Sequence, residues 1–232
     1  MSALSNVNTR GDGAASPGGG FASISTPELN SLQTGESVRY ALTPEKSWHV
    51  LRATYGRAKQ VYDYITQDGV DSDAYIAMHY VKKRKNGKTR RIKKPLIPGI
   101  LFVYCTDSII ETYVKDTPAI HFVRYYYNHL IHYPDGTNPP LKVTYPQMMN
   151  FIKATSIDDD NIQVIDERFV KYQSGDLVKI VEGKFAGVVG RVARAAGQQR
   201  VIINLDGVAL IATAYIPTAF LEKIDTSKDS PS

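Results

Sequence analysis

The sequence of 232 residues contains one cysteine, Cys105. A single thiol cannot form an internal disulfide, and it cannot supply the paired cysteines on which structural zinc sites depend. No run of about 18 apolar residues occurs, so the sequence predicts no transmembrane helix. Residues 1–46 lack the apolar core of a secretion signal, and we therefore expect the protein to stay in the cytoplasm.

Residues arranged for catalysis are equally scarce. The run Gly87–Thr89 ends like a phosphate-binding loop, but the first glycine of that motif would fall on Lys82. His129 and His132 are three residues apart and lack the carboxylate that metalloprotease motifs place between them. Cys105 ends an apolar strand, where a buried and unreactive thiol is expected. The sequence therefore predicts no enzyme, no cofactor and no metal site.

Positive charge is concentrated in one segment. The formal net charge is +5, from 28 basic and 23 acidic residues. Without the nine basic residues between Lys82 and Lys94, the chain keeps 19 basic and 23 acidic residues, a net charge of −4. Clustered cations without acids are typical of a contact with nucleic-acid phosphates, and a solvated hairpin tip is the alternative. The sequence predicts this contact at Lys82, Lys83, Arg84, Lys85, Lys88, Arg90, Arg91, Lys93 and Lys94.

The N-terminal half has the pattern of a mixed α+β domain. Residues 1–46 are rich in glycine and serine and predict a disordered leader. Residues 47–156 alternate between the two-residue period of strands and the 3.6-residue period of helices. The order β-α-β-β-α-β with a closing helix predicts a split βαβ, ferredoxin-like domain in which the basic segment connects two strands. The expected elements are strand 48–53, helix 58–65, strands 75–81 and 100–104, helix 109–114, strand 119–127 and helix 146–152.

The C-terminal part has the pattern of a small all-β unit. Residues 157–172 are acidic and weakly periodic, and they predict an extended linker. Between residues 173 and 226, five short apolar runs alternate with turn signals, which predicts a minimal closed barrel of the SH3-like kind. Residues 227–232 are expected to form a tail. The five expected strands are 177–181, 188–194, 201–205, 208–215 and 220–224.

The strand before Cys105 allows three interpretations. In RNA-recognition domains, aromatic residues on the third strand stack bases. Aligned on that motif, Pro98–Cys105 keeps Gly99, Phe102 and Val103 but has aliphatic or thiol side chains at two of the three ring positions. An apolar protein-binding surface therefore fits better than a stacking platform. The third interpretation is that Phe102 and Tyr104 simply pack against a helix.

Three residue runs together resemble NusG, a family of transcription factors with an N-terminal NGN domain and a C-terminal KOW domain. The runs are Trp48–Arg52 followed by Gly56 and a helix, the run Pro95–Val103, and Gly175–Val192. The Pro95–Ile100 run, the helix at 145–152 and the basic segment are similar to the UpxY-type antiterminators of capsular polysaccharide operons. The sequence departs from general NusG proteins at Ile100, where tyrosine is usual.

The resemblance implies a bacterial, cytoplasmic protein that binds partners and catalyses nothing. In NusG-like proteins the N-terminal domain binds the clamp helices of the large RNA polymerase subunit. The start of the first helix, here Arg57, Lys59 and Gln60, implies a contact with DNA, and the basic segment implies upstream DNA or nascent RNA. Lys184 and Phe185 match a loop that implies a contact with Rho or a ribosomal protein. The implied polymerase-binding residues are Arg52, Ile97, Ile100, Phe102 and Tyr104.

Two functions therefore remain open at this point. The first is a transcription elongation or antitermination factor that binds RNA polymerase, with a polysaccharide biosynthesis operon as the expected target. The alternative is an RNA-binding module that acts on leader transcripts without contacting polymerase. Both functions use the basic segment, but only the first requires an apolar surface around Ile100 and Phe102 that is open to a partner.

Overall fold

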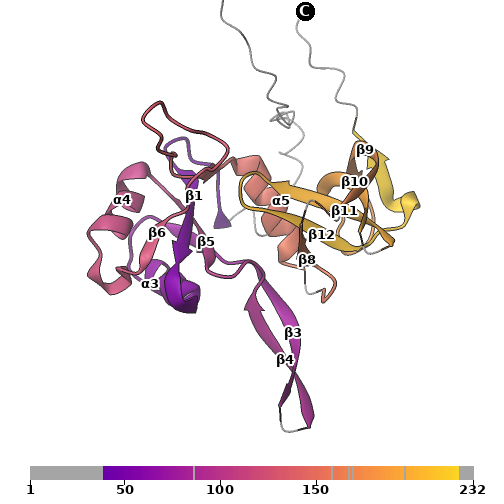
Figure 1. The fold of residues 1–232 in the computed structure, drawn as a ribbon, viewed down its shortest axis with the longest axis horizontal. Helices are drawn as coiled ribbons and strands as arrows, with labels where there is room; N and C mark the ends of the chain where they lie inside the picture. The colour runs from indigo at the N-terminus through magenta and orange to yellow at the C-terminus, as the bar shows by residue number, and fades with distance from the viewer. Residues whose placement is uncertain are drawn as a thin grey trace, which may run out of the picture.

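The computed structural model describes residues 39–85, 87–157, 159–166, 168, 170–195 and 197–224 (Figure 1). Its N-terminal part combines an antiparallel sheet with helices, as the sequence predicts. Strand β1 lies between β5 and β6, with Trp48 opposite Tyr104 and Val50 opposite Phe102. The strands follow the order β2 (Asp73–Tyr75), β5 (Ile100–Cys105), β1 (Ser47–Ala53) and β6 (Val123–Tyr125), and β7 (Lys142–Val143) also pairs with β1.

Helices cover both faces of the N-terminal sheet because side chains alternate along its strands. Leu51, Leu101 and Val103 share a buried cluster with helices α3 (Ala58–Ile65) and α4 (Asp107–Lys115). Val50 and Phe102 point to the opposite face and pack in a cluster with helix α5 (Tyr145–Thr155). Short 3-10 turns lie at Thr54–Gly56, Pro118–Ile120 and Thr218–Phe220. The three predicted helices are confirmed, and each falls where its apolar period predicts it.

The basic segment forms a hairpin of its own. Strands β3 (Met78–Lys85) and β4 (Lys88–Pro95) pair only with each other, in register from Met78 opposite Pro95 to Lys85 opposite Lys88. The hairpin projects away from the rest of the molecule (Figure 1). The sequence predicted a connection here, and the structure corrects this to paired strands. Cross-strand contacts such as Val81 opposite Ile92 give the ribbon apolar pairs between its charged ones.

The C-terminal sheet confirms five predicted strands and adds a sixth. Its strands follow the order β13 (Leu221–Lys223), β9 (Lys171–Ile180), β10 (Val189–Ala195), β11 (Gln198–Leu205), β12 (Ala209–Tyr215) and β8 (Gln163–Ile165). Strand β8 comes from the segment that the sequence predicted as a linker, and it pairs with the edge strand β12. Within the described residues no backbone pairing joins β8 to β13, so the expected closed barrel is an open path of hydrogen-bonded strands.

The leader is ordered further toward the N-terminus than the sequence predicted. Residues 1–38 lie outside the described residues. Tyr40, however, is 3% exposed and packs edge-on against Trp48, with 5.1 Å between ring centroids. Its backbone carbonyl accepts a hydrogen bond of 2.6 Å from the Tyr145 hydroxyl. A single large ring in a polar segment was too weak a signal to predict this packing.

The two sheets meet at helix α5. The Asn150 side chain is 7% exposed, and its Nδ2 donates to the carbonyl of Val189 at 2.7 Å. Its Oδ1 accepts a hydrogen bond of 2.8 Å from the Val189 N–H. One turn earlier, Gln147 Nε2 donates to Asp206 Oδ2 at 2.6 Å. One buried apolar cluster contains residues of both sheets, so the two sheets pack against each other through a shared core.

Candidate functional site

The apolar residues expected to meet a partner are covered in this structure. Ile100 is 7% exposed and Phe102 is 1% exposed, and Tyr104 is also buried. The ring centroid of Phe102 lies 5.4 Å from that of Phe151 on α5. The Tyr104 hydroxyl accepts a hydrogen bond of 2.9 Å from the N–H of Thr43. The expectation of an open apolar hollow at these positions is therefore corrected, and packing against a helix is what the structure shows.

Two arginines at the edge of the same sheet face are exposed to solvent. Arg52 is exposed on β1, opposite Ile100 on one side and Arg124 on the other. Residues directly opposite each other in antiparallel strands point to one side of the sheet, so the two arginines are neighbours. Ile97, at the entrance to β5, is half-buried. Arg124 was missed from the sequence, although the alternation of the 123–125 strand could have indicated it.

The hairpin carries cations on both of its faces. Its register places Lys83, Arg90 and Lys94 on one face with Lys85 and Lys88. The other face holds the remaining four, which are Lys82, Arg84, Arg91 and Lys93. Among the residues that the structure describes, Arg91 is the one of these nine that meets a carboxylate, Asp160 at 2.7 Å. Eight uncompensated cations on a projecting ribbon form a surface suited to phosphates.

The start of α3 presents a strained aromatic residue beside a cation. Tyr55 has a φ of 56°, which is unfavourable for a bulky side chain, and it is 89% exposed. The Arg57 guanidinium lies 4.8 Å from the ring centroid of Phe122 and 5.7 Å from that of Tyr55. Lys59 is paired with Asp63 at 2.6 Å, and Gln60 is exposed. Strained and exposed residues cluster at functional sites, and Tyr55 was missed from the sequence.

We expect Tyr55→Asn to stabilise the fold and to weaken nucleic-acid binding. Asparagine tolerates a positive φ, so the free energy of unfolding should rise by about 1 kcal/mol. Loss of an exposed ring that stacks a base should lower affinity for a single strand about 5-fold to 10-fold. Urea unfolding and fluorescence anisotropy measure the two effects. Tyr55→Phe is the matched control and should change neither, whereas a less stable Tyr55→Asn variant would contradict the prediction.

Two residues of the C-terminal unit, Lys184 and Phe185, were expected to contact a partner, and they differ in exposure. Phe185 is 3% exposed inside the apolar cluster, so its expected exposure is corrected. It lies in a tight turn in which Val188 N–H donates to the Phe185 carbonyl at 3.0 Å. Lys184 remains exposed, with its Nζ 3.9 Å from Asp159. Gly183 and Gly187, both with positive φ, lie on either side of this turn.

Two further side chains with reactive groups, Cys105 and His49, are buried. Cys105 is buried, as predicted, and burial raises the pKa of its thiol to about 12. His49 is buried beside it, and desolvation lowers the pKa of its imidazole to about 4. In the part of the chain that the structure describes, no three His, Cys, Asp or Glu residues are grouped to hold a metal ion. No helix in that part is long and apolar enough to cross a membrane.

Comparison with known proteins finds a similarity in the N-terminal region. Residues 46–136 match the family model described as "Transcription termination factor nusG". No curated protein sequence matches the chain. Among solved structures, one described as "Domain interaction in Thermotoga maritima NusG" is 18% identical over 78% of this chain and 98% of that chain, with a TM-score of 0.41. The part of the chain that is similar to this family, residues 46–136, includes the strands β1 to β6, the basic hairpin, α3 and α4.

Proposed function

We propose that the protein is a specialised NusG-like transcription factor that binds RNA polymerase and promotes processive elongation or antitermination. The observation that carries the proposal is the similarity of residues 46–136 to the NusG family model. The cationic hairpin inside this region supports a position beside the nucleic acids of a transcribing complex. In vitro transcription with purified polymerase tests it: the protein should reduce pausing or terminator release, and equal transcript profiles with and without it would contradict the proposal.

The polymerase-binding surface that we propose includes Arg52, Ile97, Ile100, Phe102 and Tyr104. Arg52 and the half-buried Ile97 are accessible in the closed arrangement, whereas Ile100 and Phe102 are not. Contact through all five residues therefore requires α5 and the C-terminal sheet to move away from the N-terminal sheet. The clamp helices of the large polymerase subunit are the proposed partner of this face.

Arg52→Glu should reduce retention of core RNA polymerase about 10-fold or more. The substitution removes the positive charge of Arg52. The new carboxylate would lie beside Arg124 and would neutralise the positive charge of that side chain as well. Because both positions are on the surface, the fold should keep its stability. A pull-down with purified core polymerase measures retention. Lys115→Glu on α4, which covers the opposite face, is the control, and unchanged retention by Arg52→Glu would exclude this face.

The alternative function is an RNA-binding module that acts on leader transcripts without polymerase. The burial of Ile100 and Phe102, together with eight unpaired cations on the hairpin among the described residues, favours this alternative. The same pull-down separates the two functions. Retention of polymerase that depends on Arg52 supports the first, and retention of RNA alone, insensitive to Arg52, supports the second.

We propose a polysaccharide biosynthesis operon as the target, because the Pro95–Ile100 run resembles UpxY-type antiterminators. Deleting the gene should lower the distal transcripts of such an operon more than the proximal ones, which RNA sequencing measures. For the C-terminal sheet we propose the role of a KOW domain that contacts a ribosomal protein or Rho. In the arrangement described here, Lys184 is accessible for this contact and Phe185 is not.

A further inference from the structure

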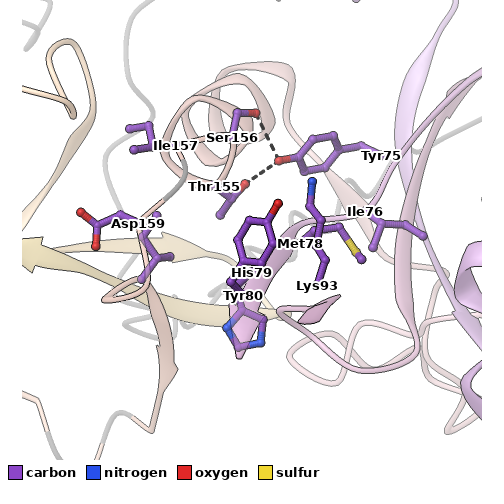
Figure 2. Close-up of a pocket in the computed structure, with 11 residues that line it drawn as sticks. Tyr75, Ile76, Met78, His79, Tyr80, Lys93, Thr155, Ser156, Ile157 and Asp159 are labelled. Atoms are coloured by element: carbon purple, nitrogen blue, oxygen red, sulfur yellow. Dashed lines mark hydrogen bonds between the residues drawn. The ribbon is translucent and has the colours of Figure 1, made fainter. Parts of the chain in front are cut away.

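Helix α5 has a hollow at each of its ends. The hollow at the C-terminal end measures about 260 Å³, and in it the Tyr75 hydroxyl is hydrogen-bonded to Thr155 at 2.7 Å and to Ser156 at 3.5 Å (Figure 2). The hollow at the N-terminal end measures about 250 Å³, and its lining includes two lysines and no acidic residue. Of these two hollows, only the second is lined by a residue whose buried polar atom lacks a hydrogen-bond partner among the described residues.

This unpartnered atom is the indole nitrogen of Trp48. The residue is fully buried, and its Nε1 has no hydrogen-bond partner in the part of the chain that the structure describes. Trp48 lies opposite Tyr104 on β5 and opposite Val143 on β7, so these three side chains share the sheet face that α5 covers. All three residues line the hollow. A buried N–H without an acceptor is costly, and an acceptor in the hollow would recover that cost.

Lys46 supplies a positive charge on the same face. It comes two residues before Trp48, and its Nζ lies 5.9 Å from the centroid of the Tyr104 ring. Its side chain is only 11% exposed, whereas its ion-pair partner, the carboxylate of Asp71, is 83% exposed. An ion pair with so exposed a carboxylate contributes little to stability, so the ammonium group of Lys46 can be shared with a ligand.

Lys142, the second lysine of the lining, does not add to this charge. It lies opposite His49 in the register of β7 and β1, so its side chain points to the other face of the sheet. There its Nζ donates to Asp107 Oδ1 at 2.6 Å. One cation therefore serves the hollow, which suits a single oxyanion and does not suit a polyanion such as nucleic acid.

The first turn of α5 also favours a negative charge. Thr144 is the N-cap of this helix of 11 residues, and its side chain makes no capping hydrogen bond. Thr144 and Tyr145 both line the hollow. The first N–H groups of a helix lack partners within the helix, and the helix dipole adds a partial positive charge there. An oxyanion at this place would therefore meet N–H donors as well as the charge of Lys46.

From these observations we infer that the hollow binds a small organic acid through its oxyanion, which is a carboxylate or a phosphate. The oxyanion accepts a hydrogen bond from Trp48 Nε1, pairs with Lys46 and accepts a further bond from the Thr144 hydroxyl. The volume of about 250 Å³ equals that of about eight waters at roughly 30 Å³ each, so the ligand is a small molecule. The site lies at the opposite end of β1 from α3, and it goes beyond the proposed function because it involves neither polymerase nor nucleic acid.

Nuclear magnetic resonance of the full chain tests the site, because Trp48 is the single tryptophan of the sequence. A chain labelled with ¹⁵N in the indole ring gives one indole cross-peak. Titration with acetate and with inorganic phosphate, at constant pH and ionic strength, should move the indole proton to a higher chemical shift, as expected when an N–H gains an acceptor. The change should saturate with a dissociation constant in the millimolar range. Sodium chloride is the reference salt and should leave the peak in place.

Lys46→Met should weaken binding of both ions at least about 10-fold, because it removes the cation and keeps the aliphatic stem that packs over Tyr104. Thr144→Val should weaken binding about 3-fold, because it removes one neutral donor. Lys115→Met is the matched control, since it removes an exposed lysine of α4 on the other face of the sheet. This control should bind both ions as the unsubstituted chain does.

Thermal unfolding gives a second measurement. Ions such as phosphate stabilise folded proteins in general, so the informative quantity is the difference between the unsubstituted chain and Lys46→Met. Either ion should raise the midpoint temperature more in the unsubstituted chain, because binding stabilises the folded state. The ion that binds more tightly identifies a carboxylate or a phosphate site, and either result supports the inference.

Three results would overturn the inference. The first is an indole peak of the unsubstituted chain that neither ion moves further than sodium chloride does, and this result needs no variant. The second is a peak that moves equally in the unsubstituted chain and in Lys46→Met. The third is an equal rise of the midpoint temperature in these two chains, which would show a general salt effect only.

Discussion

Replacing all nine basic residues of the hairpin with glutamine should lower affinity for nucleic acid by about 10³-fold or more at low salt. Each phosphate contact releases counterions, so the slope of log K against log salt falls by about 0.9 for each cation lost. If six to nine cations contact phosphates, the slope should decrease by about five to eight. Anisotropy titrations at several salt concentrations measure both quantities. Unchanged affinity and slope would show that the ribbon is only a solvated hairpin.

The two faces of the hairpin can be tested separately. One variant replaces the five cations of the Lys83 face, and the other replaces the four cations of the Lys82 face. A ribbon inserted in a groove of a duplex contacts phosphates on both sides, so both variants should lose affinity. A ribbon that lies flat on a strand should lose affinity in one variant alone. Lys115→Gln with Lys184→Gln, two exposed lysines elsewhere, is the control for total charge.

Asn150→Asp should separate the C-terminal sheet from α5. The aspartate would keep an acceptor for the Val189 N–H, but its second oxygen would face the Val189 carbonyl in place of an N–H donor. A buried charge beside a carbonyl should cost about 3 kcal/mol, which lowers the equilibrium constant for docking more than about 100-fold. Small-angle X-ray scattering should detect a larger radius of gyration.

The matched control is Gln163→Glu, which adds the same charge at an exposed position on β8. Its radius of gyration should equal that of the unsubstituted chain. If the docked sheet restricts access to Ile100, Asn150→Asp should also retain more core polymerase in the pull-down. An unchanged radius of gyration in Asn150→Asp would mean that contacts other than the Asn150 amide hold the two sheets together.

The helices and central strands follow from local patterns. Ala58, Val61 and Ile65 recur at the helical period and are the buried residues of α3. Trp48 and Val50 alternate on one face of β1, as the two-residue period predicts. Such patterns indicate which residues share a face, and both predictions are confirmed. They carry no information on which element covers that face.

The candidate site is harder to predict for this reason. Ile100 and Phe102 share a face, as predicted, but their burial depends on α5, which begins at Tyr145, and on the C-terminal sheet, which follows it in the chain. Phe185 is buried in a turn that lies between two glycines of positive φ, and the identity of the ring does not reveal its burial. The hairpin lacks apolar alternation, so its pairing could not be distinguished from a loop. Trp48 and Thr144 line one hollow only through the tertiary fold.

The pairing of β8 with β12 leaves a very short connection between the two sheets. Helix α5 ends at Thr155 and β8 begins at Gln163, so only seven residues join them. Fully extended, seven residues span about 24 Å. A sheet tethered this closely has an effective concentration in the millimolar range, even when it is undocked. A competing partner at about micromolar concentration would have to bind roughly a thousandfold more tightly to keep the sheet displaced.

The basic hairpin can offset the disadvantage that a free partner has in competing with the tethered C-terminal sheet. It is exposed while the sheets are docked, so it can engage nucleic acid on a transcribing complex before any apolar surface opens. If the protein is held there as proposed, the polymerase surface that it binds is itself a local ligand, and the competition becomes one between two tethered partners. On the proposed function, the length of the connection therefore predicts a threshold: free partners in solution should fail to open the molecule, and a partner met on a nucleic-acid-bound complex should succeed.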